Sequence, residues 1–146
     1  MSDAFNNKPP TLFWVIATIL FLWNFTGLML YYGHVTMTPE MLAETFSEAE
    51  RAFMEQTPVW ATAAYATAVT AGVIGALLML LRKAWALPLF IVSLVAVLIQ
   101  NFEAFVLSDV TAVWGTSAFT LPAIVILICV FEIWSSRSAT TQGWLN

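Results

Sequence analysis

The chain has 146 residues, of which 60% are hydrophobic and only 10% are charged, and its formal net charge is −4. Soluble domains carry about 25% charged residues, so this composition argues against a soluble enzyme and against a disordered tail. A nucleic-acid-binding protein would carry clustered basic residues, whereas this chain has five basic residues against nine acidic ones. We therefore expect an integral membrane protein whose surroundings are the lipid bilayer, with no nucleic-acid partner.

Four apolar stretches are long enough to cross a membrane as helices. A bilayer core about 30 Å thick needs about 20 helical residues. None of the four stretches contains lysine, arginine or aspartate, and they lie at residues 12–33, 59–81, 84–107 and 113–134. The sequence predicts an all-α fold: a four-helix transmembrane bundle that forms a single membrane domain over residues 1–146.

The first stretch, residues 12–33, is expected to remain in the protein as a transmembrane helix. Its apolar run is too long for a cleavable signal peptide, and no small-residue cleavage site follows it. Asn24, Tyr31 and His34 fall on one helical face, which is therefore polar. Two interpretations of Asn24 remain open, a hydrogen bond to another helix or a substrate ligand. His34 is either an interfacial residue or part of a site.

Residues 38–56 separate the first two spans and predict an amphipathic helix. Thr38 followed by Pro39 is typical of a helix start, and Ser47 followed by Glu50 is a capping-box pattern that allows a second start. Apolar residues share one helical face and acidic residues share the other. An acidic helix is expected to pack on the protein rather than on the membrane surface. It is either a simple connector or a lid and partner-binding surface.

The second span is expected to begin with Thr57 as its N-cap and Pro58 as its first helical residue. Small residues recur every four positions on two of its faces, a pattern that lets helices approach closely. These positions are Ala64, Ala68, Gly72 and Ala76 on one face, and Ala63, Thr67, Ala71 and Gly75 on the other. They favour tight packing within one chain or, alternatively, a homo-oligomer.

The third span carries a carboxylate, Glu103, about 10 Å outward of the membrane midplane. Gln100 lies on the same face, and Asn101 is turned about 100° away from it. Ionisable residues within spans usually face the protein interior. Glu103 is therefore either a proton or substrate site, clustered with the polar face of the first span, or a residue that is only hydrogen-bonded to another helix.

The fourth span contains a proline, the only cysteine of the chain and a second carboxylate. Pro122 is expected to kink this helix near Ala118. Cys129 is expected to be a buried small hydrophobe. Glu132 is expected to form an ion pair at the level of the lipid headgroups, with Arg137 as one of the nearby basic residues.

The distribution of basic residues predicts the orientation in the membrane. Lys8, Arg82, Lys83 and Arg137 fall on one side of the four spans, and only Arg51 falls on the other. Cytoplasmic loops carry the excess of basic residues. Both termini are therefore expected to be cytoplasmic, with residues 38–56 on the outer side.

Several longer motifs run through most of the chain. They resemble a family of small bacterial four-span proteins that often carry the label "sugar transporter". The resembling stretches are residues 22–27, 47–51, 57–62, 80–86 and 143–144. The resemblance implies a bacterial inner-membrane protein, and it implies no catalytic residues.

The sequence leaves two functional hypotheses open. The first is a small-solute, transporter-like protein that acts through the outer polar cluster and requires a dimer or a partner for transport. The second is a non-enzymatic accessory subunit of a larger membrane complex. No nucleophile–base pair, phosphate-binding loop, haem ligand pair or CxxC motif is present. We therefore expect no enzymatic activity, no cofactor and no metal site, and the substrate remains unknown.

Overall fold

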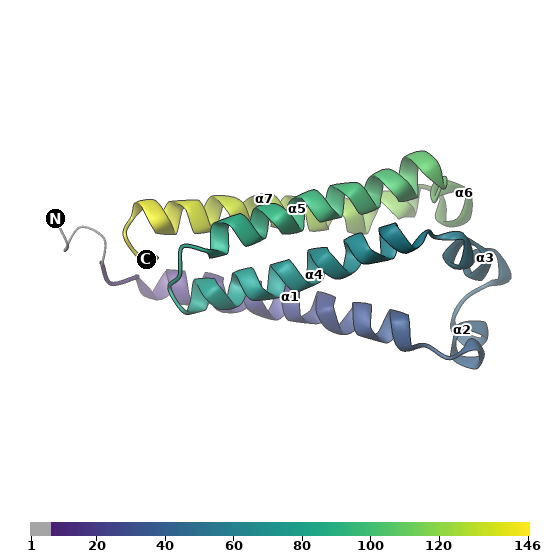
Figure 1. Ribbon diagram of the computed structural model, residues 1–146, viewed down its shortest axis with the longest axis horizontal. Coiled ribbons are helices and arrows are strands. Elements are labelled where there is room, and N and C mark those ends of the chain that lie inside the picture. Colours follow the sequence, from purple (N-terminus) through teal and green to yellow (C-terminus); the bar gives the residue numbers. More distant parts are fainter. Residues whose placement is uncertain (1–6) are drawn as a thin grey trace.

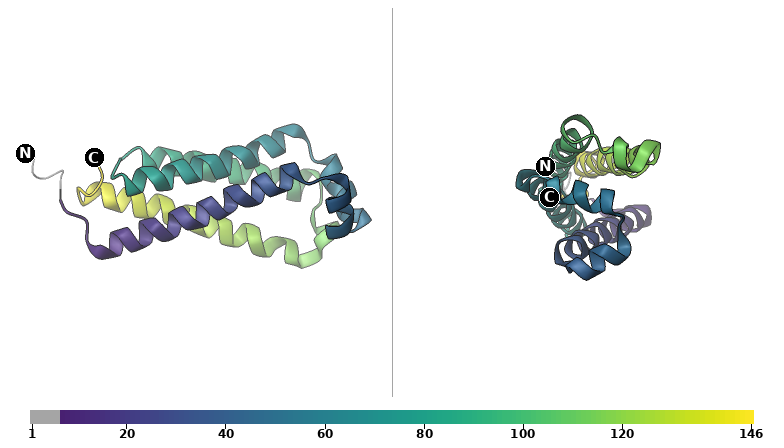
Figure 2. Two further views of the ribbon diagram at one scale, coloured as in Figure 1. Left: turned by 90° about the horizontal axis from the view of Figure 1, so that it is seen from below. Right: turned by 90° about the vertical axis from the view of Figure 1, so that its right-hand side faces the viewer.

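The computed structural model describes residues 7–146, which are mostly helical and contain no β-strand. Four helical segments are long and apolar enough to cross a membrane, and they lie side by side in one elongated bundle (Figures 1 and 2). The chain is a multi-pass membrane protein, so the expected all-helical architecture with four spans is confirmed. The segments are Thr11–Thr36 (α1), Val59–Leu80 (α4), Ala86–Leu107 and Thr111–Thr141.

The last two spans are composite. The third joins α5 (Ala86–Phe102) to a π-helix, η2 (Glu103–Leu107). The fourth contains the short helix α6, the 3₁₀-helix η3 and the long helix α7, with bounds Thr111–Trp114, Gly115–Phe119 and Thr120–Thr141. The helix α7 continues to Thr141 instead of ending at residue 134, because Ser135, Ser136 and Ala139 are buried against the bundle despite their low hydropathy.

The helical irregularity expected near Ala118 is present. The 3₁₀-helix η3 covers Ala118, and it begins at Gly115, whose φ of 62° only glycine adopts easily. Pro122 lies in the first turn of α7 rather than in the middle of a helix. Its missing N–H therefore breaks no hydrogen bond within α7, and the proline lies where the 3₁₀-helix η3 changes to α7.

The segment between the first two spans forms two helices, α2 (Pro39–Thr45) and α3 (Glu48–Gln56), rather than one continuous helix. The chain is extended at Phe46, and α3 begins with the expected capping box. Glu50 N–H donates to Ser47 Oγ at 3.2 Å, and Ser47 N–H donates to Glu50 Oε2 at 2.8 Å. The second helix start is thus confirmed.

Thr57 does not cap the second span, so that expectation is wrong. Thr57 is the C-cap of α3, and its hydroxyl donates to the Phe53 carbonyl at 3.1 Å. Because this hydroxyl is engaged by the preceding helix, α4 begins after Pro58 without a side-chain cap.

The four spans pack in the order α1, α4, α5, α7, with α4 and α5 in the closest contact. Small residues of α4 make this packing possible, as expected, because Ala68, Ala71, Gly72, Gly75 and Ala76 are all buried. A Cβ added to Gly75 would lie 3.0 Å from the Phe90 ring of α5. Both small-residue faces thus contribute to packing within one chain, and of their positions only Ala63 and Thr67 are exposed. A second protomer on this helix stays a prediction.

The bundle has two distinct ends. We call the end formed by residues 7–10, 81–85 and 142–146 the Arg82 end, and the end formed by residues 36–58 and 108–119 the loop end; they lie at opposite ends of the molecule (Figure 1). Lys8, Arg82 and Lys83 share the Arg82 end, whereas Arg51 lies in α3 at the loop end. This separation supports the basis of the orientation argument, and the cytoplasmic placement of the Arg82 end remains a prediction.

Candidate functional site

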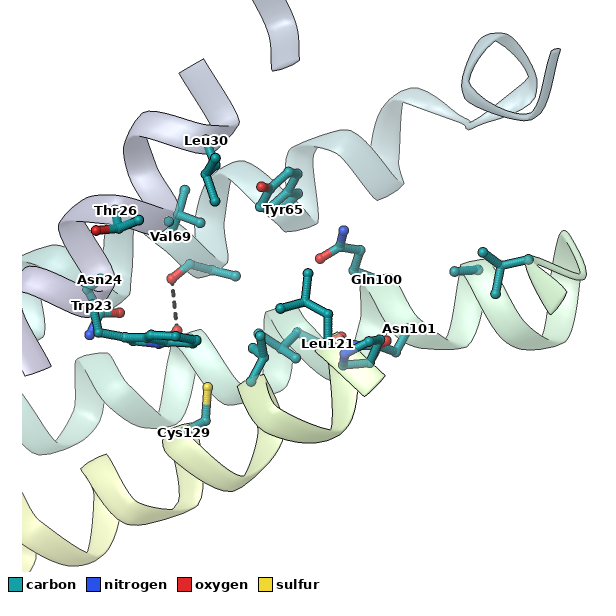
Figure 3. A pocket seen from close by; sticks show the side chains of 18 of the residues that line it. Trp23, Asn24, Thr26, Leu30, Tyr65, Val69, Gln100, Asn101, Leu121 and Cys129 are labelled. Carbon is teal, nitrogen blue, oxygen red and sulfur yellow. Dashed lines mark hydrogen bonds between the residues drawn. The ribbon is translucent and has the colours of Figure 1, made fainter. Parts of the chain in front are cut away.

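A cavity of about 360 Å³ lies among the four spans in the half of the bundle toward the loop end (Figure 3). Every span contributes to its wall. The polar side chains come from Asn24 and Thr26 of α1, Tyr65 of α4, Ser93, Gln100 and Asn101 of α5, and Cys129 of α7. Most of the remaining wall is apolar, and it includes Trp23, Leu30, Val69, Val97, Leu121 and Val125.

The cavity opens on the flank of the bundle, between α1 and α7. Leu30 of α1 and Leu121 of α7 both line it, yet 63% and 62% of their surfaces are exposed. The buried residues of α1 end at Asn24, so the second half of this helix leaves the bundle core. In a membrane, this flank faces the acyl chains of the bilayer.

Three of the expected site residues line the cavity together: Asn24, Gln100 and Asn101. Asn24 is buried, and both α5 amides are partly buried. The Asn101 side-chain amide donates to the Val97 carbonyl of its own helix at 2.8 Å. Residues from the polar faces of α1 and α5 therefore line one cavity in this half of the bundle, and their role in binding stays a prediction.

Tyr31 and His34 are not among the lining residues. The Tyr31 ring packs edge-on against Tyr65, with ring centroids 5.1 Å apart, and His34 is exposed with its ring 6.3 Å from that of Tyr65. Tyr31 and His34 thus lie beside Tyr65, which lines the cavity, and closer to the loop end. A direct role for either in binding a solute stays a prediction.

Glu103 is buried, with 3% of its surface exposed, but it does not line the cavity. Its carboxylate accepts a hydrogen bond from the Ser108 hydroxyl, and its carbonyl accepts one from Ser108 N–H at 2.9 Å. These contacts close the π-helix that ends the third span. The hydrogen bond lies within this connection rather than reaching another helix, and a proton or substrate role for Glu103 stays a prediction.

Glu132 is the residue whose expected position the structure corrects. It is not at the headgroup level, because only 1% of its surface is exposed and it accepts a hydrogen bond from the Asn24 side-chain amide of α1. Since α7 runs on to Thr141, Glu132 lies about 14 Å inside that helix end. A sequence signal was present: Cys129, Glu132 and Ser136 share one helical face with Ala139, and all are buried.

Asn24 is the residue that joins this buried carboxylate to the cavity. Its amide nitrogen donates to the Leu20 carbonyl at 2.8 Å as well as to Glu132. Its oxygen lies against Gly72 of α4, because a Cβ on that glycine would be only 2.1 Å from it. Nearby, the Ser93 hydroxyl donates to the Ala68 carbonyl at 2.8 Å. A glycine at position 72 is thus what allows a polar group to sit at this point of the core.

The arrangement can bind a small molecule with a large apolar surface and a few hydrogen-bonding groups. Within residues 7–146, no group of three or more histidine, cysteine, aspartate or glutamate side chains is placed to hold a metal ion. Comparison with protein-family models, with curated proteins and with solved structures found no match to this chain.

Proposed function

We propose that this membrane protein binds a small, mainly apolar solute in the cavity between α1 and α7, as one step of a transport-like role. The observation that carries the proposal is the cavity itself, whose 360 Å³ open on the flank of the bundle. Sites for small molecules occupy roughly 300–1,000 Å³ and combine apolar walls with a few polar groups. A solute dissolved in the bilayer has direct access to such an opening.

The lining favours a solute with one or two polar groups over a free sugar. A sugar carries a hydroxyl on nearly every carbon, and each hydroxyl buried without a partner costs about 1–3 kcal/mol. Most of the wall is apolar, and the Asn101 amide already donates to its own helix. We therefore propose a solute that is less polar than the sugar expected from the sequence resemblance.

Movement of the solute across the membrane requires a second state. Hydrogen bonds tie the described backbone together at the Arg82 end, and the cavity lies in the other half of the bundle. A four-helix chain leaves little room for an alternating pathway, which favours a homo-oligomer or a partner subunit for the complete transport cycle. In the alternative role of an accessory subunit, a helix of the partner would occupy the cavity instead of a solute.

The test measures saturable binding of naphthol, a small aromatic ring system with one hydroxyl, to the full chain in lipid nanodiscs. The variant Gly27→Leu places a large side chain in the cavity wall, where an added Cβ would lie 3.7 Å from Val69. We expect it to abolish saturable binding. The matched control is Gly33→Leu on the same helix, where an added Cβ meets nothing within 4 Å.

Equal binding by Gly27→Leu and the unmodified chain would contradict the proposal. So would binding that rises in proportion to the lipid and shows no saturation. Either result would favour the accessory-subunit role, for which the cavity is a contact surface for another helix.

A further inference from the structure

Glu132 is a buried carboxyl group that the proposed binding function does not yet use. It lies within a membrane span, 1% exposed, and its described hydrogen bond comes from a neutral amide, that of Asn24. A carboxylate buried without a cationic partner is costly, and ionisable groups in spans commonly mark sites that exchange protons or bind ions. Asn24 also lines the cavity, so the carboxyl group is one residue removed from the solute.

We propose that Glu132 is a reversible proton-binding site and that Asn24 couples it to the cavity. The inference rests on the proposed solute site for its coupling, whereas proton binding at Glu132 stands on the buried pair alone. One proton from the surrounding solution adds to the Glu132 carboxylate and makes it neutral, and release returns the same proton. No other reactant takes part.

The ionisable groups on the surrounding helices are placed so that Glu132 is the proton-binding group of this part of the core. The ionisable side chains of α1 are Tyr31, Tyr32 and His34, and that of α4 is Tyr65; all lie in the half of their helix toward the loop end. The helix α5 contains none. On α7 itself, Cys129 lies one turn before Glu132 and is buried, and Arg137 is exposed.

Proton binding and solute binding are coupled because Glu132 and the solute compete for one hydrogen-bond donor, the Asn24 amide nitrogen. The Asn24 amide nitrogen donates to Glu132, and this is the hydrogen bond described for that carboxylate. A solute that accepts from Asn24 draws the donor away, which penalises the charged form of Glu132 more than the neutral form. Solute binding and proton binding therefore promote each other, and the linkage is reciprocal.

Infrared difference spectroscopy of the full chain in lipid vesicles tests the proton site. Spectra are recorded between about pH 5 and about pH 9, a range that brackets the titration of perturbed carboxyl groups. We expect a carbonyl band of a protonated carboxyl group that changes with pH, is absent from Glu132→Gln and is retained in Glu103→Gln. In Asn24→Leu, the band should move to the frequency of a carboxyl group that lacks its amide partner.

The proposal is overturned if no pH-dependent carboxyl band depends on Glu132, or if Glu103→Gln removes the band instead. The coupling is tested by adding naphthol at constant pH, which should increase the intensity of the Glu132 band. Saturable naphthol binding with no change in the band would refute the coupling while leaving the solute site intact. A Glu132 band without saturable naphthol binding would refute the solute site while leaving the proton site intact.

Discussion

The Arg82 end and the cavity half of the bundle are held together in different ways. At the Arg82 end, Arg82 Nε donates to the Trp144 carbonyl at 2.8 Å, and one of its terminal nitrogens donates to the Asn7 carbonyl at 3.0 Å. The backbone adds two further ties, since Asn146 N–H donates to the Arg82 carbonyl and Ala84 N–H to the Asn146 carbonyl, both at 2.9 Å. Three segments distant in sequence are thus joined by directional hydrogen bonds.

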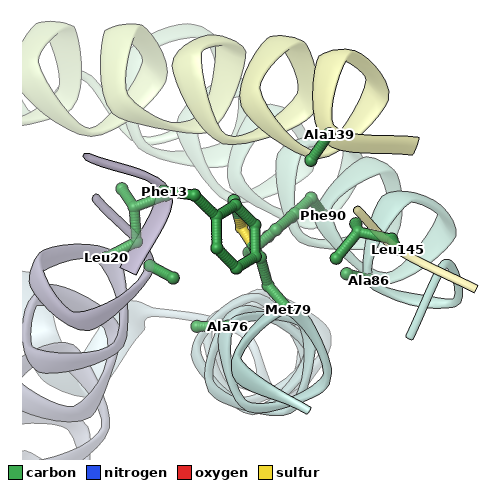
Figure 4. Packing of buried hydrophobic residues seen from close by; sticks show 9 residues of the cluster. Phe13, Leu20, Ala76, Met79, Ala86, Phe90, Ala139 and Leu145 are labelled. Carbon is green, nitrogen blue, oxygen red and sulfur yellow. The ribbon is translucent and has the colours of Figure 1, made fainter. Parts of the chain in front are cut away.

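Beneath these ties lies a dense apolar core. Phe13, Met79, Phe90 and Leu145 are nearly inaccessible and pack against one another (Figure 4). In the cavity half, α1 contributes no buried residue beyond Asn24. The bundle is thus closed by packing and hydrogen bonds at the Arg82 end, whereas its other half contains the cavity in which we propose that a solute binds.

The largest effect is expected from Gly72→Ala, at the boundary between the two halves. The added Cβ would lie 2.1 Å from the Asn24 side-chain oxygen and 3.0 Å from its carbon. Overpacking of this kind costs about 1–3 kcal/mol. Unfolding of the full chain in mixed micelles should show this loss, and Gly33→Ala, in open space on α1, should show none.

The same clash predicts a rescue. Because the obstructing atoms belong to Asn24, the double variant Gly72→Ala with Asn24→Ala should lose less stability than the sum of the single variants, by about 0.5–3 kcal/mol. Additive losses would show that Asn24 does not lie against Gly72.

Arg82→Gly removes the hydrogen bonds of the Arg82 side chain while keeping the backbone conformation of the turn. Arg82 has a φ of 59°, a conformation that favours glycine, and its N–H donates to the Met79 carbonyl at 3.0 Å, as in helix ends of the Schellman type. The variant should therefore keep the turn but lose the guanidinium contacts, at about 2 kcal/mol. Faster amide exchange at Ala84 and Asn146 would confirm this, and naphthol binding should persist. Unchanged exchange would show that the side chain does not hold this end.

The sequence predicts the positions of the spans better than it predicts the contacts between them. Hydropathy locates the spans because membrane insertion depends on each segment by itself. The burial of Glu103 was expected because ionisable residues within spans usually face the protein interior. The Asn24–Glu132 pair joins residues 108 positions apart, so it depends on how α1 and α7 are brought together. Basic residues near Glu132 in the sequence suggested an ion pair, whereas its position on the buried face of α7 decides the contact.

Phe53→Leu tests how α3 is attached at the loop end. The Phe53 ring packs edge-on against Trp114 of α6, with centroids 5.2 Å apart. Such pairs contribute about 0.5–1.5 kcal/mol beyond their buried area. Amide exchange across residues 48–56 should increase in this variant and change less in the control Phe46→Leu, at the break between α2 and α3. Equal effects would indicate that the Trp114 contact does not attach the helix.

The smallest effect is expected from acidification of the loop end. The Ser47 N–H that donates to Glu50 holds the pKa of this carboxyl group below its ordinary value of 4.5. Desolvation acts against this effect, and the side chains of Ser47 and Trp114 add to it. A carboxyl group with a lowered pKa in the folded state stabilises the fold above its unfolded pKa, and this contribution disappears as the pH falls through the folded pKa. The first turn of α3 should therefore fray below pH 4.5.

Amide exchange at Glu50 and Arg51 measures this fraying. The control is Glu50→Gln, which retains a capping-box hydrogen bond but cannot titrate. At each pH the two chains are compared directly, and an equal pH dependence in both would assign the fraying to another group.

Alkylation of Cys129 in lipid vesicles tests most directly the claim that the cavity opens to the bilayer. Cys129 is the only cysteine in the chain, and it lines the cavity while remaining 96% covered by protein, with 4% exposed. We predict that the uncharged reagent N-ethylmaleimide modifies it in the folded protein, that a sulfonated maleimide does not, and that Gly27→Leu slows the reaction. Equal modification by both reagents would show a cavity open to water, and modification only after unfolding would show a closed bundle; either result contradicts the account.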